Sequence, residues 1–157
     1  MKVRGWFISA AVACALCCEP RVAQAATTCV PTTISSAATP EILVHVRING
    51  LGPYVFFVDT GATVSIVSSA LARKLHLAAS EVVHGVGAGG SFRTRAARVD
   101  LTVGEVNQKG VVVSIFDVSQ LEAALGPVDG ALGYNFLKAY RATIDFPGHR
   151  LCLEEPL

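Results

Sequence analysis

The chain has 157 residues, of which 52% are hydrophobic and 16% are charged, and this length allows one domain of ordinary size. It excludes an enzyme built from two lobes of that size, and the supply of apolar residues excludes a disordered chain. Thirteen Lys and Arg against twelve Asp and Glu give a formal charge of +1, with no basic or acidic run. We therefore expect no nucleic-acid partner, because phosphate binding normally requires a basic stripe.

The first 25 residues have the composition of a secretory signal peptide. Lys2 and Arg4 form a positive start, an apolar stretch covers 6–18, and Ala-Gln-Ala at 23–25 provides a cleavage signature. We expect an exported protein, periplasmic or secreted, in which removal of these 25 residues leaves 132 of the 157. An uncleaved membrane anchor and lipidation at Cys14 are the alternatives, although the thirteen-residue stretch, which is apolar except for Ser9, reaches only about 20 Å as a helix.

Most of the remaining chain alternates between apolar and polar residues as strands do, so we expect an all-β fold with two or three short helices. Residues 26–40 are expected to form an N-terminal arm, irregular apart from one short strand near Cys29. A single domain over 41–154 accounts for the rest. Its strands are expected at 41–48, 54–58, 81–83, 91–103, 110–116, 142–146 and 150–153, and its helices near 68–75, 119–125 and 135–140.

Asp59 is the strongest candidate for chemistry. It follows the apolar run at 54–58 and precedes Thr60 and Gly61, so a turn built around glycine would hold its carboxylate. An ordinary Asp-Gly turn at the end of a strand would use the same residues. Two features favour a site: a glycine-rich turn at 85–90, placed as a cover would be, and an apolar segment at 130–137 that leads into a short helix.

Other motifs lack the required context. The literal GxGxxG at 85–90 is followed by an alternating strand rather than a helix. The histidines are scattered without metal-ligand spacing, and no serine lies in a nucleophile elbow. We therefore expect neither a metal nor an organic cofactor.

The chain resembles the retropepsin-like aspartic proteases, in their bacterial single-lobe form. Four segments occur in the family's order: VDTGA at 58–62, GVGAGG at 85–90, DGALGYNFL at 129–137 and RATIDFPGHRLCLE at 141–154. The resemblance covers roughly 41–154. It implies a single-lobe acid-protease barrel that is active as a homodimer and hydrolyses peptide or protein substrates.

The resemblance also implies roles for particular residues. Asp59 would be catalytic, the Thr60 hydroxyl would tie two active-site loops together, and Gly61 and Ala62 would support the carboxylate. A further loop, with Gly87, Ala88 and Gly89, would form a flap over the substrate. Another loop, with Leu132 and Gly133, would give the active site a second support.

Aspartic proteases need two carboxylates that share one proton, one to activate water and the other to protonate the scissile carbonyl. The chain has one D-T-G, and Asp117, Asp129 and Asp145 lack the following Thr-Gly. The second carboxylate would then come from Asp59 of a second copy. Because Ala62 stands where two-lobed acid proteases have a serine, we expect a mildly acidic rather than strongly acidic activity optimum.

Two alternatives belong to other classes of protein. One is a retropepsin-like dimer that binds peptides or envelope proteins without cleaving them. The other is a purely structural β-barrel dimer. Replacing Asp59 separates the binder from the enzyme, because a binder keeps its affinity without the carboxylate.

Removal of the signal would leave two cysteines, Cys29 and Cys152, and an even number in an exported protein favours a disulfide. In the family both chain ends lie in or near the dimer-interface sheet, so the resemblance implies that the two cysteines can meet. A bridge within the chain, a bridge between two copies and two free thiols all remain open.

Overall fold

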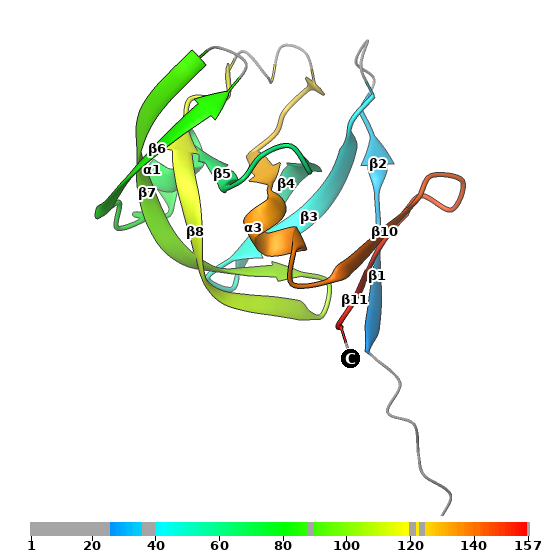
Figure 1. Ribbon diagram of the computed structural model, residues 1–157. Helices are drawn as coiled ribbons and strands as arrows, with labels where there is room; N and C mark the ends of the chain where they lie inside the picture. Colours follow the sequence, from blue (N-terminus) through cyan, green and yellow to red (C-terminus); the bar gives the residue numbers. More distant parts are fainter. Residues whose placement is uncertain (1–25, 36–39, 88–89, 120–121, 123–124, 157) are drawn as a thin grey trace, which may run out of the picture.

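The computed structural model describes residues 26–35, 40–87, 90–119, 122 and 125–156, and it is built mainly of strands (Figure 1). The elements are β1 (Thr27–Pro31), β2 (Thr33–Ile34), β3 (Ile42–Ile48), β4 (Leu51–Val58), β5 (Ser65–Ser68), α1 (Ser69–Lys74), β6 (Glu81–Gly87), β7 (Gly90–Val103), β8 (Val106–Phe116), β9 (Gly130–Leu132), α3 (Tyr134–Leu137), β10 (Arg141–Asp145) and β11 (Arg150–Glu154). The expected all-β fold class is confirmed.

The hairpin β3–β4 follows directly from the sequence. Ile42, Val44, Val46 and Ile48 are all buried, while the residues between them are half-buried or exposed. The turn at Asn49-Gly50 has φ values of 50° and 79°, which suits the tight hairpin turns that match the twist of the strands. Alternation therefore sets which face of this hairpin lies in the core.

The larger sheet has the strand order β2-β3-β4-β9-β5-β8-β7-β6, and β3 also pairs with β7. This additional pairing curls the sheet into a barrel whose interior is filled by apolar side chains. Phe56, Leu101, Leu132 and Phe136 are among the fully buried ones. The parallel pairing of β4 with β9 places the ends of these two strands side by side, at the position of Asp59.

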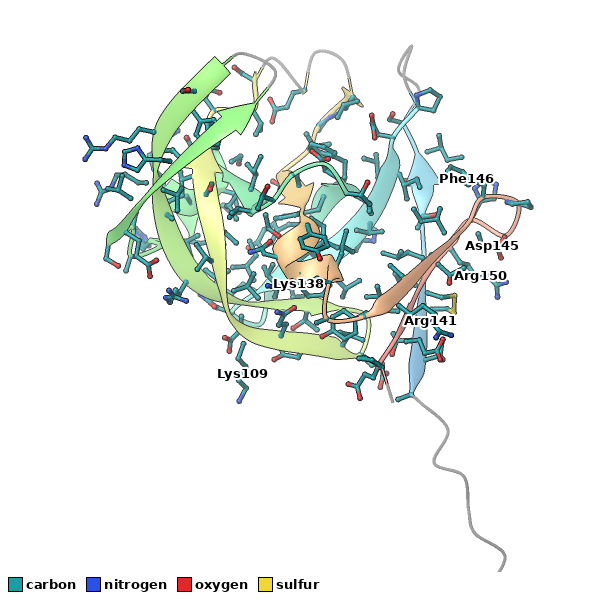
Figure 2. The ribbon with its side chains drawn as sticks, viewed as in Figure 1. Lys109, Lys138, Arg141, Asp145, Phe146 and Arg150 are labelled. Atoms are coloured by element: carbon teal, nitrogen blue, oxygen red, sulfur yellow. A yellow bond between two sulfur atoms is a disulfide. The ribbon has the colours of Figure 1, made fainter. Side chains whose placement is uncertain are left out.

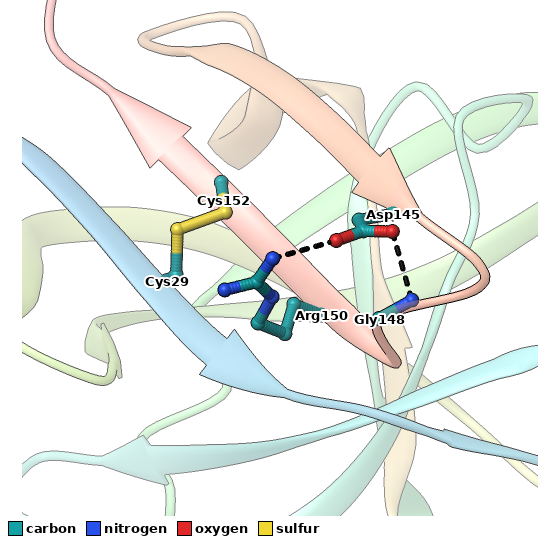
Figure 3. The surroundings of a disulfide bond; sticks show 5 residues. All are labelled: Cys29, Asp145, Gly148, Arg150 and Cys152. Carbon is teal, nitrogen blue, oxygen red and sulfur yellow. Dashed lines mark hydrogen bonds and ion pairs between the residues drawn. A yellow bond between two sulfur atoms is a disulfide. The ribbon is translucent and has the colours of Figure 1, made fainter.

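A second sheet of three strands, in the order β1-β11-β10, lies at one side of the barrel (Figure 1). Val30, Leu151 and Leu153 are buried on its inner face. Cys29 and Cys152 are register partners on its other face, with Cα atoms 4.0 Å apart, and they form a disulfide (Figure 3). The predicted pairing is confirmed, and the bridge lies within one chain.

The element boundaries differ from expectation in several places. The N-terminal arm forms strands β1 and β2 rather than one short strand, and β8 begins at Val106, four residues earlier than expected. The helix α3, after Leu132, ends at Leu137 rather than near 140. Helix α1 has the expected serine cap, in which Leu71 N donates to Ser68 Oγ at 3.0 Å. The helix expected at 119–125 falls mostly outside the described residues.

In the part of the chain that the structure describes, no helix is long and apolar enough to cross a membrane.

Candidate active site

Asp59 lies in the turn that follows β4, and the backbone of that turn orients its carboxylate. Gly61 N and Ala62 N both donate to Asp59 Oδ1, at 2.9 Å and 3.0 Å. Asp59 N donates in turn to Leu132 O at 3.0 Å, extending the pairing of β4 with β9. Asp59 is half-buried, so the carboxylate is held by two N–H groups on one oxygen while the residue stays accessible.

The loop after β9 supports this turn from the other side. Tyr134 N donates to Ala62 O at 2.7 Å and Asn135 N donates to Thr63 O at 3.2 Å. The loops approach so closely that a Cβ on Gly133 would lie 2.8 Å from Ser65 N. A larger residue at position 133 would therefore force the two loops apart.

A polar pair, the buried Ser65 and the half-buried Asn135, joins the two loops, and sequence reasoning missed it. Ser65, which is fully buried, donates its N–H and its hydroxyl to Asn135 Oδ1, both at 2.8 Å. Ser65 Oγ also accepts from Gly133 N at 3.0 Å, and Asn135 Nδ2 donates to Val112 O at 2.7 Å. The only sign of this pair in the sequence was that Ser65 and Asn135 are polar residues within mostly apolar segments.

A cleft of about 380 Å³ opens beside the Asp59 turn. Its lining comes from the active-site turn and β5, from the hairpin β6–β7, and from β8: Asp59, Gly61, Ala62, Thr63, Val64, Ile66, Val83, His84, Gly85, Phe92, Ser114 and Phe116. Asp59 is the one carboxylate among these described lining residues. A single acid therefore faces a cleft whose lining is both apolar, as at Ile66, Val83 and Phe92, and polar, as at Thr63, His84 and Ser114.

The structure brings most of the predicted site residues together. Gly61, Ala62, Leu132 and Gly133 surround Asp59 as described above. Thr60 is exposed, and its hydroxyl has no hydrogen bond to another residue in the part of the chain that the structure describes.

The predicted flap residues are only partly described. Gly87 ends β6 and pairs with Gly90, whereas Ala88 and Gly89 lie outside the described residues. The hairpin that leads to them does line the cleft, through Val83, Gly85 and Phe92.

The other described aspartates are engaged locally. Asp129 Oδ2 accepts from Val55 N at 2.9 Å and Asp100 Oδ1 accepts from Gly110 N at 2.9 Å. Hydrogen bonds from the backbone and side chain of Ser119 lower the pKa of Asp117 below its usual range. Bonds from Arg150 and then Gly148 do the same for the pKa of Asp145. These four carboxylates therefore have structural partners outside the cleft.

Within the described residues, no group of three or more His, Cys, Asp or Glu side chains is arranged to hold a metal ion.

The comparisons with known proteins agree with this geometry. A family model described as aspartyl protease matches residues 44–136, and the chain belongs to this family. No curated protein is similar enough in sequence to count as a match.

Many solved structures match the chain, and two of them are described here. One is a retropepsin-like aspartic protease from Rickettsia conorii, with 17% identity and a TM-score of 0.55 over 83% of this chain and 94% of that one. The other is the retroviral protease-like domain of Ddi1 from Leishmania major, with 19% identity and a TM-score of 0.49 over 74% of this chain and 92% of that one. At its level of identity the first likeness shows the retropepsin-like fold.

Proposed function

We propose that the protein is an exported aspartic endopeptidase that works as a homodimer. The observation that carries the proposal is that one aspartate lines the cleft while the others are hydrogen-bonded elsewhere. Asp59 is the one carboxylate among the described residues that line the cleft, whereas Asp100, Asp117, Asp129 and Asp145 are bound to their own surroundings. One chain thus offers one catalytic carboxylate to a reaction that needs two.

A second copy would complete the site. The two Asp59 carboxylates would meet on the two-fold axis and share one proton, so that one activates a water and the other protonates the scissile carbonyl. The Gly61 and Ala62 N–H groups would stabilise the ionised form of each carboxylate at Oδ1.

Two exposed features suit contact with that copy. Thr60 and Tyr134 lie beside the Asp59 turn, and Tyr134 is 54% exposed although its backbone is fixed to Ala62. The outer strand β10 pairs only with β11, and Arg141, Ala142 and Thr143 along it are exposed. A sheet edge of this kind is a ready template for pairing with another chain.

The signal-like composition of residues 1–25 supports export, although these residues lie outside the described part of the structure. The disulfide is in keeping with an oxidising compartment. We expect a periplasmic or secreted protein.

Peptide-library cleavage tests the function. The protein beginning at residue 26 should cleave extended peptides containing apolar residues, and Asp59→Asn should cleave none while keeping its fold and its dimer. A wild type that cleaves no peptide, and that binds peptides with the same affinity as the Asp59→Asn variant, would instead be a binding module.

A further inference from the structure

A second groove lies on the face of β7 and β8 that points away from the cleft of Asp59. Ile115 on β8 lines this groove, whereas its neighbours Ser114 and Phe116 line the cleft, because successive residues of a strand point to opposite faces. The volume of the groove is about 530 Å³, compared with about 380 Å³ for the cleft. Its other lining residues come from α1, from the segment after α1 and from β7, and they include Arg73, His76, Leu77, Ala79 and Arg95.

The ionisable side chains of this groove are all basic. Arg73, His76 and Arg95 line it and are exposed, and no carboxylate is among its described lining residues. Neither arginine forms an ion pair within the described part of the chain, whereas the nearby Arg98 is paired with Glu81 at 2.6 Å. Residues 26–157 contain ten Lys and Arg against eleven Asp and Glu, so the positive charge of this basic groove is a local feature.

Contacts of the two arginines show where their charges lie. Arg95 Nε donates to Ala79 O at 3.1 Å, and Arg95 Nη2 donates to the same oxygen. Because this carbonyl is neutral, the guanidinium is held at the groove while its charge stays uncompensated. Hydrogen bonds from Ser119 lower the pKa of Asp117, and the charge of Arg73 contributes to the same shift. Arg73 therefore lies near the end of β8, although it forms no ion pair with Asp117.

The basic surface continues from the groove along the outer face of the hairpin β6–β7. A neighbouring depression of about 400 Å³ is lined by Val82, Arg93, Thr94 and Arg95, so Arg95 belongs to both. Val82 is the register partner of Arg95 and is 46% exposed. A ligand that followed this surface from α1 across β7 to β6 would therefore meet both cations and apolar side chains.

We propose that the basic groove and the adjoining face of the hairpin bind an extended acidic segment of a partner protein, in which Asp or Glu alternates with apolar residues. Arg73, Arg93 and Arg95 supply the complementary charge, while Leu77 and Val82 offer apolar contacts. A compact anion such as phosphate would contact one end of this surface and none of its apolar residues. The proposal concerns a site on the other face of the strands and does not depend on the proposed catalysis.

The experiment measures the binding of fluorescent peptides to the protein beginning at residue 26, with Asp59→Asn so that no probe is cleaved. The acidic probe alternates Glu with Leu and Val, a second probe has Lys in place of Glu, and a third has Ser in place of the apolar residues. Adding Arg73→Glu and Arg93→Glu together should weaken binding of the acidic probe by at least about tenfold, because two attractions become repulsions. Both arginines are exposed, so we expect this variant to fold as its parent does.

The matched control reverses two charges that lie outside the groove. Lys109→Glu and Lys138→Glu, made together at two exposed residues (Figure 2), change the net charge equally and should alter the affinity by less than about twofold. Lys109 is about 20 Å from Ile115 along the extended strand β8. An equal loss of affinity in the two double variants would overturn the proposal.

The remaining probes decide what kind of ligand the surface takes. The Lys probe and the Ser-spaced probe should both bind much more weakly than the acidic probe. Equal binding of the Lys probe, or no binding of the acidic probe, would overturn the proposal, and equal binding of the Ser-spaced probe would overturn the role of the apolar residues. Sedimentation with phosphatidylglycerol vesicles is the last measurement. Binding to these vesicles that requires Arg73 and Arg93, without binding of the acidic probe, would overturn the protein partner in favour of a membrane surface.

Discussion

The hydroxyl of Ser65 donates a 2.8 Å hydrogen bond to the side-chain oxygen of Asn135, across 70 residues of sequence. With the bonds from Ser65 N to Asn135 Oδ1 and from Gly133 N to Ser65 Oγ, it fixes the loop after β9 against the segment that follows Asp59. The position of the Asp59 turn therefore depends on a pair that does not line the cleft.

Asn135→Ala should weaken both stability and activity. The variant leaves Ser65 N, Ser65 Oγ and Val112 O without their partner, and an unsatisfied buried group costs about 1–3 kcal/mol. We expect a loss of about 3 kcal/mol in the free energy of unfolding, and a lower kcat at temperatures where the variant is still folded. Asn107→Ala, which removes an exposed hydrogen bond from Asn107 Nδ2 to Thr102 Oγ1 on the surface of β8, is the control and should change the free energy by no more than about 1 kcal/mol. Equal effects of the two variants would argue against a positioning role.

The disulfide should contribute substantially to stability. It closes a separation of 123 residues between Cys29 and Cys152, for which the chain-entropy model gives at most about 5 kcal/mol. The double variant Cys29→Ser, Cys152→Ser should unfold at clearly lower denaturant concentration than the oxidised wild type. A reducing agent should destabilise the wild type and leave the double variant unchanged.

Non-reducing electrophoresis of the same samples checks the connectivity. An intrachain bridge predicts migration as a monomer, and a covalent dimer band would contradict it. Since β1 pairs only with β11, we also expect the reduced protein to lose the order of β1 first, which hydrogen exchange at Thr28 and Val30 would detect.

The residue after D-T-G should set the acidic limit of activity. Ala62 N already donates to Asp59 Oδ1, so a hydroxyl on this residue would begin close to the carboxylate. Ala62→Ser should favour the ionised form and move the acidic limb of the pH–rate profile to lower pH. Ala70→Ser, on the exposed side of α1, is the control. An acidic limb that stays in place in Ala62→Ser would refute the explanation.

The hairpin β10–β11 should lose stability in acid. Asp145 Oδ2 accepts from Arg150 Nη2 at 2.8 Å and its Oδ1 accepts from Gly148 N at 2.8 Å (Figure 3). Because these bonds lower the pKa of Asp145 below its ordinary value of 3.8, the stabilisation is complete above that value and is lost as the pH falls through the lowered pKa.

Asp145→Asn should therefore lower the melting temperature at pH 7 and have much less effect in strong acid, below the lowered pKa. Thermal unfolding under the two conditions measures this difference. Glu105→Gln, at an exposed turn carboxylate, serves as the control. A penalty for Asp145→Asn that is as large in strong acid as at pH 7 would contradict the assignment.

Local pattern was sufficient to predict much of the fold. The alternation of Ile42, Val44, Val46 and Ile48 placed β3, and a serine cap placed the start of α1. β8 was predicted too short because its first residues, 106–109, are mostly polar and become a strand only by pairing with β7. Their conformation is decided by a neighbouring strand, which a local pattern does not contain.

In the candidate site, too, residues adjacent in sequence could be predicted and contacts between distant segments could not. Asp59, Thr60 and Gly61 are adjacent in sequence, so their turn could be predicted together with its carboxylate. Ser65 and Asn135 meet only because β5 and β9 lie next to each other in the sheet. The Phe92 ring covers Gly85 only in one register of the hairpin, and no spacing rule gives that register without the structure.

The central claim is that two chains build one catalytic site, and mixing wild type with Asp59→Asn tests it most directly. The two proteins are unfolded together, refolded with oxidation at a fixed total concentration, and assayed at increasing fractions of the variant. Because a mixed dimer holds one catalytic carboxylate, activity should fall with the square of the wild-type fraction, to about a quarter at equal amounts. Activity that falls only in proportion to the wild-type fraction would mean that each chain carries its own complete site.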